Sequence, residues 1–170
     1  MDTVSIQSPK YGLNDKWNLY YHLPDDKSWE VSSYTTILGD IQCAEEVIAL
    51  NKDIPDAVIA KCMLFLMRKG ITPMWEDPKN RSGGCFSYRI LNKQVSDVWR
   101  ILMYLCCGET LASKPENAKH INGITISPKK NFCIVKIWLD TTSFQDPIFI
   151  KQIANLPIQG CLFKKHAPEF

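Results

Sequence analysis

The chain has 170 residues, 45% of them hydrophobic, and a formal net charge of +2. This length favours one domain with a sizeable core, while the small net charge excludes a protein that attracts nucleic acid through its overall charge. Its seven cysteines include no Cys-x-x-Cys pair, so buried thiols in a reducing compartment are favoured over a disulfide framework or a zinc site.

We expect residues 1–10 to form a flexible tail and residues 11–170 to form a single domain. Hydrophobic periodicity predicts three strands and one helix there. The strands are expected at residues 17–21, 29–31 and 62–67, and the helix at residues 41–52. Asp40 fits as the N-cap of this helix, and one helical face would carry Ala44, Val47, Ile48 and Asn51.

The second half is expected to hold a strand after the Gly83-Gly84 turn, a helix, two paired strands, a further helix and a last strand. Their expected positions are residues 85–91, 95–107, 121–127, 131–139, 147–156 and 160–165. Gly108 would end the first of these helices. The other has Asp146 as its cap and Pro147 at its first position, and it would direct Ile150, Ile153 and Ala154 to the core before Pro157 ends it. Strands outnumber helices and come partly in hairpins, which indicates an α+β domain with an antiparallel sheet backed by three helices.

The segment Pro73-Met74-Trp75-Glu76-Asp77 sets a large aromatic ring beside a carboxylate, just before a glycine-rich turn. An indole can stack on a purine, and a carboxylate can accept two hydrogen bonds from the N1–H and exocyclic amine of guanine. A guanine methylated at N7 is cationic, so stacking would gain about 2 kcal/mol of cation–π attraction in a dry site. We expect Glu76 to read the base, so that replacing the next acid, Asp77→Asn, changes little.

Several segments in order resemble the eukaryotic translation initiation factor 4E family, over about residues 11–166. They are Lys16-Trp17-Asn18-Leu19-Tyr20-Tyr21, Lys27-Ser28-Trp29, Gly70-Ile71-Thr72-Pro73-Met74-Trp75-Glu76-Asp77, Val98-Trp99, Cys107-Gly108-Glu109-Thr110 and Lys136-Ile137-Trp138. The resemblance implies a curved sheet with helices on its convex face and the mRNA cap bound in its concave face. It also implies that Trp29 and Trp75 sandwich the 7-methylguanine, that Glu76 reads it, and that Trp138 lies near the methyl group.

The triphosphate of a cap needs cations beyond the base. The resemblance assigns this part to Lys129 and Lys130, in the turn between the two paired strands. The family has a further lysine four residues before its strand Trp, where this chain has Ile134. Lys136, two residues before Trp138, shares its face by strand alternation and could substitute. Surface-loop lysines are common, so these three lysines could also be solvated side chains that bind no ligand. For Trp29 and Trp75, burial in the core likewise stays open.

Other chemistries find little support in the sequence. The three histidines are far apart and lack nearby ligands, so we expect neither a metal nor a cofactor. Acids occur only in pairs, which argues against a cap-cleaving enzyme. No apolar run is long enough to span a membrane, and residues 1–10 lack the core of a signal peptide. We expect a cytoplasmic, monomeric, non-enzymatic binding module, with the nucleus as a second location.

The resemblance further implies that a scaffold subunit docks a helix on the convex face. The matching residues here are Tyr11, Gly12, Leu13, Ile48, Arg100, Ile101 and Tyr104. The family has His-Pro-Leu at the first three of these positions and Trp at position 48, so ordinary scaffold docking is expected to be weakened or altered. Two functions remain open: an initiation factor for capped messages, or a cap-binding competitor that does not recruit the scaffold. A protein that merely keeps the fold is a remote third.

Overall fold

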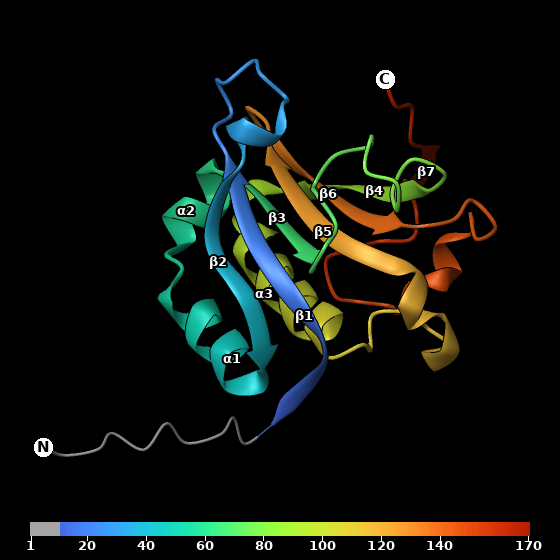
Figure 1. The fold of residues 1–170 in the computed structure, drawn as a ribbon, viewed down its shortest axis with the longest axis horizontal. Helices are drawn as coiled ribbons and strands as arrows, with labels where there is room; N and C mark the ends of the chain where they lie inside the picture. The colour runs from blue at the N-terminus through green and yellow to red at the C-terminus, as the bar shows by residue number, and fades with distance from the viewer. Residues whose placement is uncertain (1–10) are drawn as a thin grey trace, which may run out of the picture.

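The computed structural model describes residues 11–170, so the expected tail at residues 1–10 lies outside the described residues. One antiparallel sheet has the strand order β2-β1-β3-β5-β6-β4-β7. The strands are β1 Gly12–His22, β2 Thr35–Cys43, β3 Met63–Arg68, β4 Gly84–Leu91, β5 Ile121–Pro128, β6 Phe132–Leu139 and β7 Leu162–Lys165. In Figure 1 the helices lie behind this curved sheet. The expected α+β fold with a curved antiparallel sheet is confirmed.

Strand alternation gives the sheet two apolar faces. Leu64 and Leu66 of β3 point into the main core, which the helices cover, whereas Phe65 and Met67 point to the opposite face. There they join a smaller cluster with Cys85 and Trp138, partly covered by Trp75 and other aromatic side chains. Because successive strand residues point to opposite faces, a residue's register in the sheet determines which of these two clusters it joins.

The first predicted helix begins three residues too early. Helix α1 spans Ala44–Asp53 and its N-cap is Cys43, because the preceding residues belong to β2, a strand that the sequence reading missed. Asp40 does not cap the helix; it has a φ of 54° and its carboxylate pairs with Lys69 at 2.7 Å. Val47, Leu50 and Asn51 are buried, but Ile48 faces outward.

Two further predictions in this half were wrong. Residues 29–31 form no strand, and a short 3₁₀ helix, η1 Val31–Ser33, follows Trp29 instead. Helix α2, Asp56–Lys61, was not predicted. It is too short for periodicity to reveal, and its N-cap is Pro55. The next helix was predicted correctly: α3 spans Val95–Cys107 and ends at Gly108.

The predicted helix at residues 147–156 is absent. Asp146 does cap, its carboxylate accepting from the Ile148 N–H at 3.0 Å, but only the 3₁₀ turn η4 Pro147–Phe149 follows. The backbone then bonds to residues 111–113 instead of to itself: the Ser113 N–H donates to Phe149 O at 2.8 Å, and the Lys151 N–H donates to Leu111 O at 2.9 Å. Ile150 and Ile153 are buried as expected, although not in a helix. Ala154, also expected to face the core, is exposed because the chain turns there.

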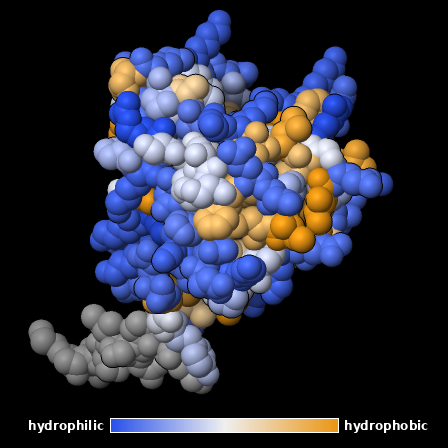
Figure 2. All heavy atoms as spheres, turned by 90° about the vertical axis from the view of Figure 1, so that its right-hand side faces the viewer, coloured by the Kyte–Doolittle hydropathy of each residue, from blue (hydrophilic) through white to orange (hydrophobic). Residues whose placement is uncertain are grey.

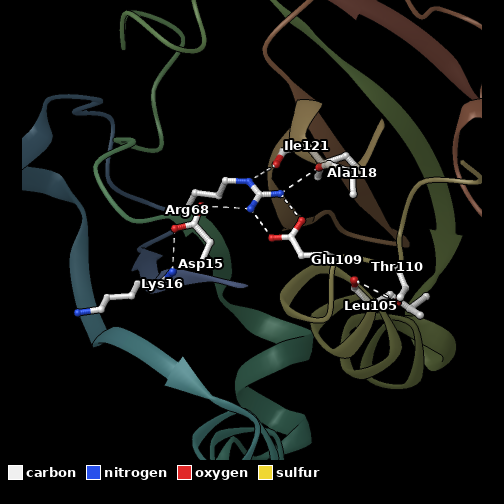
Figure 3. Close-up of polar contacts among 8 residues, drawn as sticks. All are labelled: Asp15, Lys16, Arg68, Leu105, Glu109, Thr110, Ala118 and Ile121. Carbon is white, nitrogen blue, oxygen red and sulfur yellow. Dashed lines mark hydrogen bonds and ion pairs between the residues drawn. The ribbon is translucent and has the colours of Figure 1, made fainter. Parts of the chain in front are cut away.

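A buried arginine ties the far end of β3 to the exit of α3 (Figure 3). The guanidinium of Arg68 donates to both carboxylate oxygens of Glu109 and to the backbone oxygens of Ala118 and Ile121. Burial opposes its charge, but its neighbours, Glu109 foremost and Asp15 with it, together outweigh burial and raise the pKa of Arg68. These charges line a hollow of about 570 Å³ and satisfy one another, so we assign this hollow a structural role.

Candidate functional site

Trp29 lies on the segment between β1 and η1, at the end of the sheet where His22 finishes β1. Its indole stacks on the His22 ring with centroids 4.2 Å apart and planes 5° apart. The two His22 ring nitrogens lie 2.8 Å from Leu23 O and 2.7 Å from Ser28 O, which fixes the ring against the segment. Trp29 nevertheless remains 51% exposed, so it is available to a ligand.

Trp75 and Glu76 lie on the loop between β3 and β4, which side-chain hydrogen bonds hold in shape. The buried Asp77 carboxylate accepts from Thr72 N, Thr72 Oγ1 and Lys79 N at 2.7 to 2.8 Å. The Asn80 amide donates to Thr72 O and Met74 O, at 3.0 and 2.8 Å. Asp77 is therefore an anchor of the loop that carries Trp75 and Glu76. The expectation that Asp77→Asn changes cap binding little stays a prediction.

Tyr34 connects the two loops on the concave face. It lies 6.4 Å from the Trp29 ring and edge-on to Phe65 at 5.2 Å, centroid to centroid. Burial, and after it the charge of Glu76, raises the pKa of Tyr34 to about 12. Trp29, Tyr34 and the Glu76 carboxylate thus share one region. Among residues 11–170 no ring contact joins Trp29 to Trp75; each stacks on a histidine instead.

Trp138 forms the floor of this region. It is only 4% exposed, and its indole N–H donates to Thr125 Oγ1 at 3.3 Å. His166 fills the space between Trp138 and Trp75, with ring centroids 4.9 Å and 5.9 Å away. A side chain so covered can shape a pocket from beneath but offers little surface for stacking.

The last residues of the described chain lie against the Trp75 loop. His166 donates its backbone N–H to Gly83 O at 3.0 Å, and its Nδ1 lies 2.6 Å from Asn80 O. Burial, opposed by this bond and helped by the charge of Lys136, lowers the pKa of His166. The Glu169 N–H then donates to Glu76 Oε1 at 3.2 Å. The carboxylate expected to read guanine therefore already holds a backbone donor.

The expected phosphate-binding lysines fall in two places. Lys129 and Lys130 are exposed in the β5–β6 turn, at the same end of the sheet as Trp29 because His22 pairs with Met63 and Leu64 pairs with Ile126. Lys136 is on the face of Trp138, as alternation predicted. Burial raises the pKa of Cys85, and the charge of Lys136 partly opposes this.

The sequence reading missed two further cations on this face. Lys164 of β7 pairs with Cys85 of β4, which pairs with Trp138 of β6, so all three share one row. Arg89 of β4 pairs with Ile134 and lies on the same face, four residues along the strand from Cys85. Alternation within β4, where Phe86, Tyr88 and Ile90 are buried, could have shown that Arg89 faces the other way. Lys164 required the pairing of β7.

The sequence model of the family described as "Eukaryotic initiation factor 4E" matches residues 12–166. The chain belongs to this family. The eukaryotic translation initiation factor 4E of Saccharomyces cerevisiae is 28% identical over 163 residues, covering 90% of this chain and 75% of that protein. The factor of Eremothecium gossypii is 30% identical, over 76% of this chain and 62% of that protein. An initiation factor 4E homolog of Acanthamoeba polyphaga mimivirus is 48% identical, but only over 37% of this chain and 23% of that protein.

Solved structures of initiation factor 4E proteins share the fold. Ascaris suum eIF4E-3 in complex with an m7G cap has a TM-score of 0.68 and 21% identity, over 78% of this chain and 75% of that one. Caenorhabditis elegans eIF4E-3, in complex with the 4E-binding protein Mextli and a cap analog, has a TM-score of 0.68 and 20% identity, over 78% and 76%. Within residues 11–170 no helix is long and apolar enough to cross a membrane, and no group of three or more metal-ligating side chains occurs.

The convex face of this initiation factor 4E family member carries the residues expected to meet a partner. Ile48, Ile101 and Tyr104 are 43%, 40% and 45% exposed. Tyr11 and Gly12, where β1 begins, lie beside the first residue of α1, since the Ala44 N–H donates to Tyr11 O at 2.8 Å. Leu13 is half-buried. Arg100 instead joins two helices: its guanidinium donates to Asn51 O, Ile54 O and Asp56 Oδ1.

Proposed function

We propose that the protein binds the 7-methylguanosine cap of mRNA and acts in translation initiation. The observation that carries this proposal is the meeting, on the concave face, of the exposed Trp29 and the Glu76 carboxylate around Tyr34. Membership of the initiation factor 4E family, and solved relatives whose titles name a cap, support it.

In this proposal Trp29 and Trp75 bind the methylated base from its two faces. Each base–aromatic stack contributes about 1–3 kcal/mol, and the positive charge of 7-methylguanine adds a cation–π term. Trp29 now stacks on His22 and Trp75 on His166. To bind the base, each indole must either move away from its histidine or stack on the base with its opposite face. The loops are therefore expected to adjust on binding, bringing together two indoles that do not touch in the described structure.

Glu76 would accept the N1–H and exocyclic amine of guanine, displacing the Glu169 N–H. Trp138 would support the base from below, consistent with its burial. Lys129, Lys130 and Lys136 would hold the phosphates, together with Lys164, whose row is that of Trp138. The charge of Lys136 already acts on Cys85 and His166, which lie beside Trp138 and Trp75.

Tryptophan fluorescence titration tests the proposal. The protein should bind 7-methylguanosine triphosphate much more tightly than guanosine triphosphate, since only the first carries a cationic base. Trp29→Ala and Glu76→Gln should each weaken binding by about 2 kcal/mol. Tyr104→Ala and Glu116→Gln serve as matched controls away from the concave face. Equal affinity for the two nucleotides would refute the proposal.

The phosphate contacts can be tested separately. Replacing Lys129 and Lys130 together with glutamine should weaken the triphosphate more than 7-methylguanosine itself. It should also flatten the dependence of affinity on salt, because fewer cations release fewer counterions. An identical loss for nucleoside and triphosphate would place the phosphates elsewhere.

The convex face favours a second candidate, a cap-binding competitor that does not recruit the usual scaffold. Ile48 offers a smaller apolar surface than an indole and lacks its N–H donor. Arg100 stands where the resemblance implies an apolar residue, and its guanidinium donates hydrogen bonds to backbone oxygens at the end of α1. A cap-affinity pull-down from lysate, probed for a co-eluting scaffold subunit, distinguishes this competitor from an ordinary initiation factor.

A further inference from the structure

Arg89 is a cation on the concave face for which the described residues provide no acidic partner. Its guanidinium carbon lies 3.9 Å from the centroid of the Phe132 ring, and within residues 11–170 it forms no ion pair. The side chain is exposed. A guanidinium held over an aromatic ring keeps its N–H donors free for a planar or tetrahedral oxyanion.

The register of the sheet places Arg89 next to Ile134, the position at which the family has a lysine that this chain lacks. Arg89 pairs with Ile134, and Ile134 pairs with Ser127 on its other side. Of these three neighbours on one face only Arg89 is charged. Adjacent strands are about 4.8 Å apart, a displacement that a long arginine side chain can span. The row of Arg89 lies four residues from that of Trp138, or about 13 Å along the strand, and thus beyond the base in the direction of the phosphates.

A hollow of about 670 Å³ opens beside Arg89, between the end of β4, the β5–β6 turn and the segment at residues 152–158. This volume lies within the range of about 300–1,000 Å³ found for small-molecule sites. The hollow exists because β7 pairs only with the first half of β4, and because residues 152–158 form a turn instead of the predicted helix. Figure 2 shows that apolar side chains gather on one face of the molecule. Ile158, which lines the hollow, is 47% exposed.

The lining of the hollow combines apolar walls with amides. Leu91, Phe132 and Ile158 provide surface on which a base can pack. Gln94, Asn131, Gln152 and Asn155 provide hydrogen-bond donors and acceptors, and the Gln94 amide donates to Asn155 Oδ1 at 2.9 Å across the rim. Amides paired with aromatic surface are a common means of holding a nucleobase.

We propose that Arg89 and this hollow bind the first transcribed nucleotide of a capped RNA, with Arg89 on the phosphates that join it to the cap. The proposal rests on cap binding by Trp29, Trp75 and Glu76. It adds a second nucleotide site, specified by the charge of Arg89, which lies on the same face of the sheet as Trp138. The occupant is a nucleotide because a free anion would use Arg89 alone and leave the amides and apolar walls without a role.

Calorimetry with two cap analogues, and with the nucleoside 7-methylguanosine as a third ligand, tests the proposal. The first is 7-methylguanosine triphosphate; the second is the dinucleotide in which a 7-methylguanosine and a guanosine share three phosphates. The protein should bind the dinucleotide at least about fivefold more tightly. Arg89→Gln should weaken dinucleotide binding by about fivefold or more and leave 7-methylguanosine unchanged. Phe132→Leu should abolish the preference for the dinucleotide.

Lys52→Gln, a loss of one charge on helix α1, is the matched control and should change neither affinity. If the protein binds both analogues equally, or if Arg89→Gln affects them no more than Lys52→Gln does, the second site is refuted while cap binding stands. If the protein binds neither analogue, both proposals fall. Weakened binding of the nucleoside by Arg89→Gln would show that Arg89 acts on the base site, which also refutes the proposal.

Discussion

The contact between the chain end and Glu76 has a measurable consequence for ligand binding. The Glu169 N–H donates to Glu76 Oε1, the acceptor that guanine would need, so the last residues compete with the base. Glu169→Pro removes this N–H without shortening the chain. Glu169→Gln keeps the N–H and removes only the side-chain charge, so the difference between the two variants isolates the backbone hydrogen bond.

The expected magnitude follows from the geometry of that bond. Hydrogen bonds to a charged group contribute about 1.5–3 kcal/mol when buried, but this one is 3.2 Å long and exposed. A contribution of about 0.5–1 kcal/mol is therefore appropriate. Releasing it should strengthen binding of 7-methylguanosine triphosphate by about two- to fivefold. Fluorescence titration of both variants under one salt condition measures this ratio.

Equal affinities for Glu169→Pro and Glu169→Gln would refute the competition. Weaker binding by Glu169→Pro would show the opposite, that the chain end supports the base site. A tighter Glu169→Gln with no further gain in Glu169→Pro would instead assign the effect to repulsion between the Glu169 carboxylate and the phosphates. Thermal unfolding of each variant verifies that the fold is retained.

Three further predictions concern the loop, the buried histidine and the convex face. Asp77→Asn should lower the free energy of unfolding by about 2–3 kcal/mol in urea titration, since at least one backbone donor loses its charged acceptor; a loss below about 1 kcal/mol would contradict this. The pKa of His166 is lowered from 6.5, so just below pH 6.5 the unfolded chain binds more protons than the folded one. The free energy of unfolding should therefore decrease as the pH is lowered through this range. His166→Asn, which cannot titrate, should flatten that slope, and an unchanged slope would exclude His166 as the cause. Peptides with a Tyr-x-x-x-x-Leu motif should bind weakly in calorimetry, and Ile48→Trp should strengthen them by about 1 kcal/mol or more, unlike the equally exposed control Ile37→Trp.

The sequence predicted best the elements whose stability is local. Helix α3 has an apolar stripe and a terminal glycine, and both its ends were correct. The segment at residues 147–156 also had a cap and a proline at its first position, but its backbone bonds went to residues 111–113. Such a choice depends on a partner that is distant in sequence. Local signals for helix initiation therefore say little about propagation when another segment offers the same hydrogen bonds.

The candidate site was predictable in its chemistry and only partly in its arrangement. Trp75 and Glu76 are recognisable because a stacking ring and a two-acceptor carboxylate must be neighbours to read one base. The contacts of His22 and His166 with the two indoles join residues 7 and 91 positions apart in the chain. No pattern in the sequence indicates them. The burial of Trp138 likewise depends on His166, which reaches it from the end of the chain.

The cations proposed to bind the phosphates follow a different rule from Glu76, the carboxylate proposed to read the base. A carboxylate that accepts two donors must lie in one plane with the guanine, so its place is tightly fixed. A phosphate can be approached from many directions, and a long basic side chain reaches across a neighbouring strand. In our proposal Arg89, which pairs with Ile134, therefore takes the place of the absent lysine, and Lys164 adds a cation in the row of Trp138. The face of the sheet, set by strand parity, is the property that a phosphate-binding cation must keep; its strand is free to change.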